Sequence, residues 1–112
     1  MMKIKIPLPQ KISINTFVNY HWAKRGKIIA LYHNALVESR NKRITRFPVE
    51  LTYRFTYKKK PLDTDNTAFS AKLLTDSMVL YGILPNDSPQ FVSALHLYSK
   101  KGARDEVEIE IV

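Results

Sequence analysis

The chain contains no cysteine. Disulfide bonds, thiolate catalysis and cysteine zinc sites are therefore excluded, and a cytosolic setting fits this composition. Long apolar runs are missing as well: no stretch approaches the ~18 residues of a membrane-spanning helix, and the N-terminal residues lack the apolar core of a secretory signal. Glycine is scarce, with 3 residues in 112, and 45% of the residues are hydrophobic, which excludes a collagen-like or mostly disordered chain. We expect a single domain over residues 1–112.

Acidic residues are nearly absent from the first half of the chain. Residues 1–60 contain 14 Lys and Arg against only Glu38 and Glu50, a balance of +12. Residues 61–112 contain 4 Lys and Arg against 8 acids, a balance of −4, and the whole chain carries +8. The basic residues are interleaved with aromatic and apolar ones, so they do not form a simple tail. A basic half of this kind attracts polyanions, and we expect nucleic acid to be the partner.

Hydrophobic periodicity predicts six elements in the order β-α-β-α-β-β. Alternation of apolar and polar residues predicts strands over 2–8, 48–58, 90–99 and 105–112. Apolar residues at helical spacing predict helices over 23–42 and 66–81, and Gly82 is a plausible left-handed stop for the second. Residues 10–22 look irregular. This order is typical of an α+β domain in which two helices cover one face of a small mixed or antiparallel sheet.

Carboxylates are concentrated in one segment of this basic protein. Four of the five aspartates lie between positions 63 and 87, namely Asp63, Asp65, Asp76 and Asp87. A hard cation would explain the cluster, because Mg²⁺ takes oxygen ligands, commonly one or two carboxylates with water and substrate phosphate. Asp63 and Asp65 are two residues apart, so an extended backbone would put both carboxylates on the same side. The competing interpretation is that Asp65 or Asn66 caps a helix and that Asp87, in LPNDSP, belongs to a β-turn.

The helix expected after Asn66 presents two charged residues to this cluster. At ~100° per residue, Lys72 and Asp76 fall on the side of Asp65. The opposite side carries the residues expected to face the core, which are Ala71, Leu74, Met78 and Tyr81. Lys72 and Asp76 could therefore border the acidic site, and the plainer interpretation is a surface ion pair worth ~0.3–0.5 kcal/mol.

Four segments together resemble the signature of RusA-type Holliday junction resolvases, which are crossover-junction endodeoxyribonucleases often encoded by phages. The segments are NYHWAKR at 19–25, DTDN at 63–66, KLLTD at 72–76 and GILPNDS at 82–88. The resemblance covers most of the chain in order. The chain departs from the family pattern in a longer stretch between Asn66 and Lys72, and in having Asn86 before Asp87 where the family often has two consecutive acids.

The resemblance implies a homodimer that binds four-way DNA junctions and makes symmetric nicks with Mg²⁺, for which Mn²⁺ can substitute. It implies catalytic roles for Asp63, Asp65, Lys72 and Asp87, with the three aspartates converging on the metal. Asn66 and Asp76 would support these residues, Asp76 by orienting Lys72.

The basic half supplies the expected DNA contacts. Lysine and arginine would contact phosphates without reading sequence, and Tyr20 and Trp22 would stack on unpaired bases at a branch point, although burial of these aromatics is an equal alternative. The full set is Tyr20, Trp22, Lys24, Arg25, Lys27, Lys58, Lys59 and Lys60.

Three other classes remain open at this point. A non-catalytic nucleic-acid-binding module would bind DNA without divalent metal, although clustered carboxylates would repel a phosphate unless a cation intervened. A restriction-like nuclease would carry an acid and a lysine two residues apart on one strand, and no Glu-x-Lys or Asp-x-Lys occurs in the chain. A phage structural or assembly protein would use its basic half to bind an acidic partner.

Overall fold

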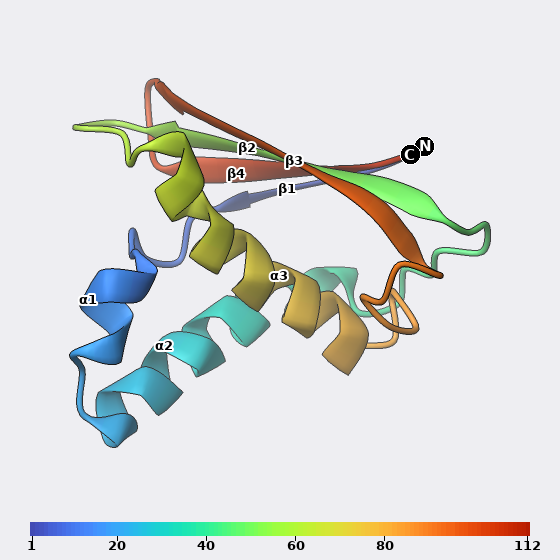
Figure 1. The fold of residues 1–112 in the computed structure, drawn as a ribbon, viewed down its shortest axis with the longest axis horizontal. Coiled ribbons are helices and arrows are strands. Elements are labelled where there is room, and N and C mark those ends of the chain that lie inside the picture. Colours follow the sequence, from blue (N-terminus) through green and yellow to red (C-terminus); the bar gives the residue numbers. More distant parts are fainter.

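All 112 residues are described by the structure, a computed structural model in which one four-stranded sheet carries every helix on the same face (Figure 1). The strands are β1 (Met2–Pro7), β2 (Val49–Tyr57), β3 (Val92–Lys101) and β4 (Glu106–Ile111). The helices are α1 (Ile14–Val18), α2 (Trp22–Ala35) and α3 (Ala68–Leu80), with short 3-10 turns η1 (Val37–Ser39) and η2 (Thr64–Thr67). The expected α+β class with a mixed sheet is confirmed, but there are three helices instead of two. None of these helices is long and apolar enough to cross a membrane.

The strands are ordered β1-β4-β2-β3 across the sheet. β4 is antiparallel to both β1 and β2, whereas β3 runs parallel to β2 and forms an edge. The short connection from β3 to β4 therefore crosses the carboxyl end of β2, where the Gly102 amide donates to the Tyr57 carbonyl at 2.9 Å. A Cβ on Gly102 would lie 2.0 Å from Cγ2 of Thr56, so this crossing requires glycine.

The segment expected to be irregular contains α1. This helix begins after Ser13, whose side chain accepts a hydrogen bond from the Thr16 amide at 3.4 Å. None of its residues is fully buried, which explains why no apolar stripe revealed it. Phe17 is its main anchor, with its ring centroid 4.7 Å from that of Phe69 on α3.

The core lies between the sheet and the helices. The alternation expected for β2 is confirmed, because Val49, Leu51, Tyr53, Phe55 and Tyr57 are all buried. Across the pairing with β4, the buried side chains of Val107, Ile109 and Ile111 face the same way. The glutamates of β4 lie on the other face, where the Arg54 Nη1 donates to Glu110 at 2.6 Å.

α3 is buried on two sides. Ala71, Leu74 and Met78 are buried as expected, but Leu73 is buried too, because α2 lies beside α3 opposite the sheet (Figure 1). The helix ends at Leu80, and Gly82 shortly after it has the predicted left-handed backbone, with a φ of 74°. α2 ends at Ala35, earlier than the expected 42, and η1 follows it.

Candidate functional site

Lys72 stands between two adjoining hollows on the exposed side of α3. The first, of about 210 Å³, lies between α3 and the edge strand β3 and contains Lys72, Thr75 and Asp87. The second, of about 290 Å³, lies beside η2 and contains Asp65, Asn66 and Lys72. Ala68 lines both hollows, so only a methyl group and the lysine stem separate them. Asp87 thus borders the same pair of hollows as three residues that precede it by at least 15 positions, Asp65, Asn66 and Lys72.

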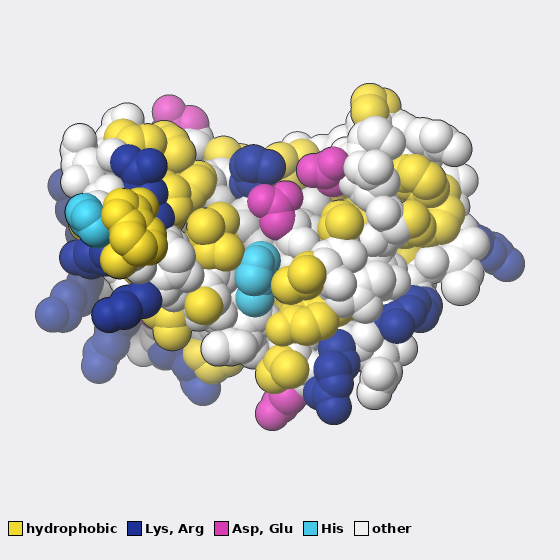
Figure 2. Space-filling view, turned by 90° about the horizontal axis from the view of Figure 1, so that it is seen from below, with side chains coloured by type: hydrophobic (Ala, Val, Ile, Leu, Met, Phe, Trp, Pro, Cys, Tyr) yellow, Lys and Arg dark blue, Asp and Glu magenta, His cyan; other side chains and the backbone are white.

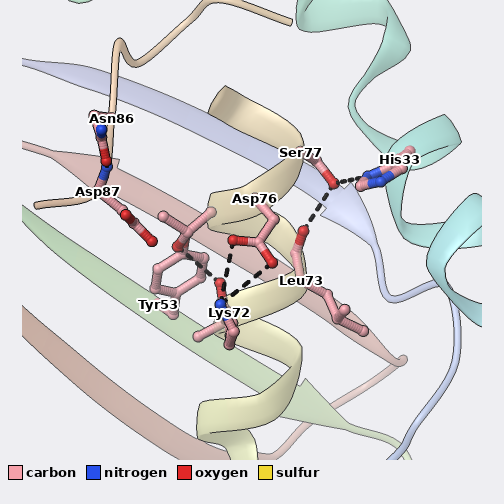
Figure 3. A network of polar contacts seen from close by, with 10 residues as sticks. His33, Tyr53, Lys72, Leu73, Asp76, Ser77, Asn86 and Asp87 are labelled. Atoms are coloured by element: carbon pink, nitrogen blue, oxygen red, sulfur yellow. Dashed lines mark hydrogen bonds and ion pairs between the residues drawn. The ribbon is translucent and has the colours of Figure 1, made fainter. Parts of the chain in front are cut away.

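A local turn directs Asp87 toward Lys72. The Asn86 side-chain oxygen accepts hydrogen bonds from the Asp87 amide at 2.6 Å and the Ser88 amide at 3.2 Å. This turn occupies the side chain of Asn86 and leaves the Asp87 carboxylate exposed and pointing toward the lysine (Figure 3). The β-turn expected at Asp87 is not found there: Asn86 forms a side-chain turn instead, and the backbone turn comes later, where the Phe91 amide donates to the Ser88 carbonyl at 2.9 Å.

Lys72 and Asp76 form an ion pair one helical turn apart. The Lys72 Nζ lies 3.4 Å from the Asp76 carboxylate, and the two side chains are 65% and 40% exposed. Water screens such a pair, so it adds little to stability. Its effect is geometric: Asp76 holds the ammonium on the side of α3 that borders Asp87 (Figure 3).

The expectation for Asp63 and Asp65 is corrected in one respect. The backbone is not extended through both residues, because the 3-10 turn η2 begins at Thr64. Asp63 is the residue before that turn and Asp65 lies within it, so the period of two that would align their side chains does not apply. Neither Asp65 nor Asn66 caps α3: that position belongs to Thr67, whose hydroxyl donates to the Thr64 carbonyl at 2.6 Å.

No group of three or more His, Asp or Glu side chains in the structure is arranged to hold a metal ion, so Asp63, Asp65 and Asp87 do not form a three-carboxylate site in it. The physical reason is that Asp65 and Asp87 border different hollows, one on each side of Lys72. The donor chemistry fits a magnesium ion held through one or two carboxylates with water and phosphate, and not an ion enclosed by three carboxylates.

Sequence reasoning missed a buried hydroxyl pair behind the first hollow, of which Thr75 lines the hollow itself. The buried Tyr53 hydroxyl lies 2.6 Å from the Thr75 hydroxyl, which in turn donates to the Ala71 carbonyl at 2.8 Å. Tyr53 is therefore the donor to Thr75. Burial raises the pKa of the Tyr53 phenol, so it stays a neutral donor beside the site. The only sequence signal was a threonine inside a helix, on the turn that also carries Lys72.

The predicted DNA-contact residues around the start of α2 differ in how free their side chains are. Trp22 is 76% exposed at the start of α2, which contradicts the alternative of burial, whereas Tyr20 is half-buried under the Lys24 ammonium, 3.9 Å from its ring centroid. Arg25 donates to the Tyr20 carbonyl at 2.9 Å and the Val18 carbonyl at 2.6 Å. Its guanidinium therefore ties down the end of α1 and is less free to contact a phosphate than its neighbours.

Basic side chains gather at one end of the molecule (Figure 2). α1, the start of α2 and the carboxyl end of β2 lie at that end (Figure 1). Lys24 and Lys27 on α2 are exposed, as are Lys58, Lys59 and Lys60 in the loop after β2. That loop runs on to Asp63, which joins the basic end to the acidic side of Lys72. No protein-family model and no curated protein sequence matches the chain.

Proposed function

We propose that the chain is a Mg²⁺-dependent, structure-selective endodeoxyribonuclease that resolves four-way DNA junctions by paired phosphodiester nicks. The observation that carries the proposal is the position of Lys72 between two hollows, with Asp65 and Asn66 in one and Asp87 in the other. A cation flanked by carboxylates, next to a basic end, suits hydrolysis of a phosphodiester better than simple attraction to DNA.

Each residue has a role that follows from its chemistry. Lys72 stabilises the negative charge that develops on the phosphate, and its ion pair with Asp76 at 3.4 Å holds the ammonium in place for this task. A magnesium ion would be held through the carboxylate of Asp65 or of Asp87, with water and the substrate phosphate as its other ligands, because the two side chains border different hollows. The ion supplies an activated water and offsets charge in the transition state. Trp22 offers an exposed ring for stacking on an unpaired base.

Paired nicks need two sites related by symmetry, so the proposal includes a homodimer. The chain has one candidate site per copy. Mass measurement in solution at several protein concentrations tests this part alone, because a protein that remains a monomer at all of them cannot make two coordinated nicks.

Incision of a synthetic four-way junction tests the reaction. We expect Mg²⁺-dependent nicks from the wild type and none from Asp65→Asn or Lys72→Ala, both of which should still bind the junction. Glu38→Gln and Lys42→Ala are matched controls, because they remove an exposed charge of the same sign outside both hollows and should cut normally. Wild-type turnover by Asp65→Asn would refute the assignment.

The alternative is a nucleic-acid-binding module without catalysis. The observation that favours it is the exposure of the Lys72–Asp76 pair, which an ordinary surface ion pair explains equally well. This alternative predicts junction binding that is indifferent to divalent cations and no products in the same assay. A protein that binds linear and branched DNA equally would also fit it better.

A further inference from the structure

A basic hollow lies at the carboxyl end of β2, away from the two hollows that Lys72 borders. It has a volume of about 390 Å³ and is lined by Lys11, Tyr57, Lys58, Lys59, Arg104 and Asp105. These residues come from three segments: the linker before α1, the end of β2, and the connection that crosses it on the way to β4. Four cations thus surround one carboxylate in a hollow built by the crossing of the chain.

The single carboxylate of this hollow is already engaged by the fold. Asp105 accepts a hydrogen bond from the Lys58 backbone amide at 2.8 Å, which fixes the crossing connection on the end of β2. No carboxylate lies within ion-pair distance of the Lys11, Lys58 or Lys59 ammonium groups, and Arg104 has only a loose pair with Glu106 at 3.8 Å. The positive charge of the hollow is therefore largely uncompensated.

Tyr57 gives the hollow a buried hydrogen-bond donor that the fold does not use. Its side chain is 1% exposed, and its hydroxyl is the only buried side-chain polar atom in the protein without a hydrogen-bond partner. Burial raises the pKa of this phenol, and the nearby Tyr32 and Asp105 raise it further, so the group stays a protonated donor at neutral pH. Buried donors nearly always find an acceptor, and this one lacks an acceptor beside four cations.

Lys11 is the cation of the hollow that lies over the Tyr57 ring. Its ammonium lies 5.5 Å from the centroid of the Tyr57 ring and donates to the Lys60 carbonyl. Lys11 is exposed, so its ammonium could exchange that carbonyl for an anion bound in the hollow. A phosphate oxygen would then accept from the Tyr57 hydroxyl and from ammonium groups together, and such charge-assisted hydrogen bonds are the strong ones.

We propose that this hollow binds a backbone phosphate of a nucleic-acid strand, with Lys11, Arg104 and the Tyr57 hydroxyl as donors beside Lys58 and Lys59. The inference rests on the proposed function for the identity of the strand. Because the loop that carries Lys58 and Lys59 continues to Asp63, the hollow would hold one arm of the DNA at a constant place relative to Lys72.

Fluorescence anisotropy with a labelled four-way junction and a labelled linear duplex, in EDTA, tests the site without incision. We expect Tyr57→Phe to weaken binding roughly tenfold, as for loss of a hydrogen bond to a charged group, without lowering the melting temperature. Lys11→Gln should weaken binding. It should also reduce the slope of the logarithm of the binding constant against the logarithm of the salt concentration by about 0.9 for duplex DNA. Lys42→Gln is the matched control, because it removes an exposed lysine outside the hollow.

The outcomes separate this site from the incision reaction. Wild-type affinity in both Tyr57→Phe and Lys11→Gln would overturn the inference and leave the proposed function standing. Absence of incision by the wild type, with binding still weakened by both variants, would refute the nuclease and support the site. If inorganic phosphate raises the melting temperature through Tyr57 while no DNA binds, the hollow takes free phosphate and the strand assignment is wrong.

Discussion

Removing one hydroxyl should stabilise this protein, and removing another from the same strand should destabilise it. Tyr53 and Tyr57 are both fully buried on one face of β2, with Phe55 between them. The Tyr53 hydroxyl lies 2.6 Å from the Thr75 hydroxyl, whereas the Tyr57 hydroxyl has no partner. The substitutions Tyr53→Phe and Tyr57→Phe therefore remove the same group from two buried positions on one face of β2, one with a hydrogen-bond partner and one without.

The expected magnitudes follow from hydrogen bonding. An intramolecular hydrogen bond adds about 1 kcal/mol net, so Tyr53→Phe should lower the free energy of unfolding by about that amount. A buried hydroxyl without a partner costs ~1–3 kcal/mol of desolvation, so Tyr57→Phe should raise the free energy of unfolding by at least ~1 kcal/mol. The two variants should thus differ by roughly 2 kcal/mol, which corresponds to roughly 8 °C in melting temperature for a domain of this size.

Urea denaturation of the wild type and both variants measures this difference, with equal slopes as the check that the unfolded states are alike. Tyr32→Phe extends the series. Its hydroxyl lies 2.5 Å from the Gln10 carbonyl and 2.8 Å from the Ser70 hydroxyl, so this variant should lose the most stability. Equal losses in Tyr53→Phe and Tyr57→Phe would show that the Tyr57 hydroxyl does have a partner, and the argument for its role as a free donor would fail.

Four further outcomes are expected. Burial raises the pKa of Tyr32 to about 12 from an ordinary value of 10.0. The stabilising effect of keeping this phenol neutral is therefore complete below pH 10, and the free energy of unfolding falls by up to about 3 kcal/mol as pH rises toward 12. Tyr32→Phe should reduce this alkaline loss in denaturation curves. Gly102→Ala should destabilise by ~1–3 kcal/mol because its Cβ would meet the Thr56 methyl at 2.0 Å, and Thr56→Ser in the same chain should restore much of the loss. Arg25→Ala should lower the melting temperature, since it releases two carbonyls at the end of α1, whereas Lys24→Ala should not. Trp22, the only tryptophan, is 76% exposed, so DNA that stacks on it should quench its fluorescence, and an unchanged spectrum at saturating junction would contradict the stacking role.

The sequence predicted the helices and strands that bury one apolar face against a single neighbouring layer. β2 and β4 each bury every second residue against the helices, so their alternation identified both strands and the buried face. α1 escaped notice because none of its residues is fully buried, and the burial of Leu73 was missed because a helical stripe reports only one packing partner. The second partner of α3, the helix α2, depends on tertiary contacts.

The candidate site also contains features that the sequence predicted and features that it did not. Lys72 and Asp76 are one turn apart on a helix, so their proximity was predictable, and the ion pair at 3.4 Å agrees with it. For Asp63 and Asp65, in contrast, we expected an extended backbone with both carboxylates on one side. The 3-10 turn that begins at Thr64 breaks that alignment. Helix caps and short turns are decided by a few hydrogen bonds, and the sequence offered several residues for each.

The amino-acid sequence by itself determined the basic charge of the first half, the alternating strands, the left-handed Gly82 shortly after α3 and the side of that helix on which Lys72 lies. Only the tertiary structure decided that β4 inserts between β1 and β2, that Asp65 and Asp87 flank Lys72 from separate hollows, and that the Tyr57 hydroxyl is left without a partner among lysines. The first group depends on neighbours within one helical turn or strand repeat. The second depends on which distant surfaces exclude water together, and no local pattern records that choice.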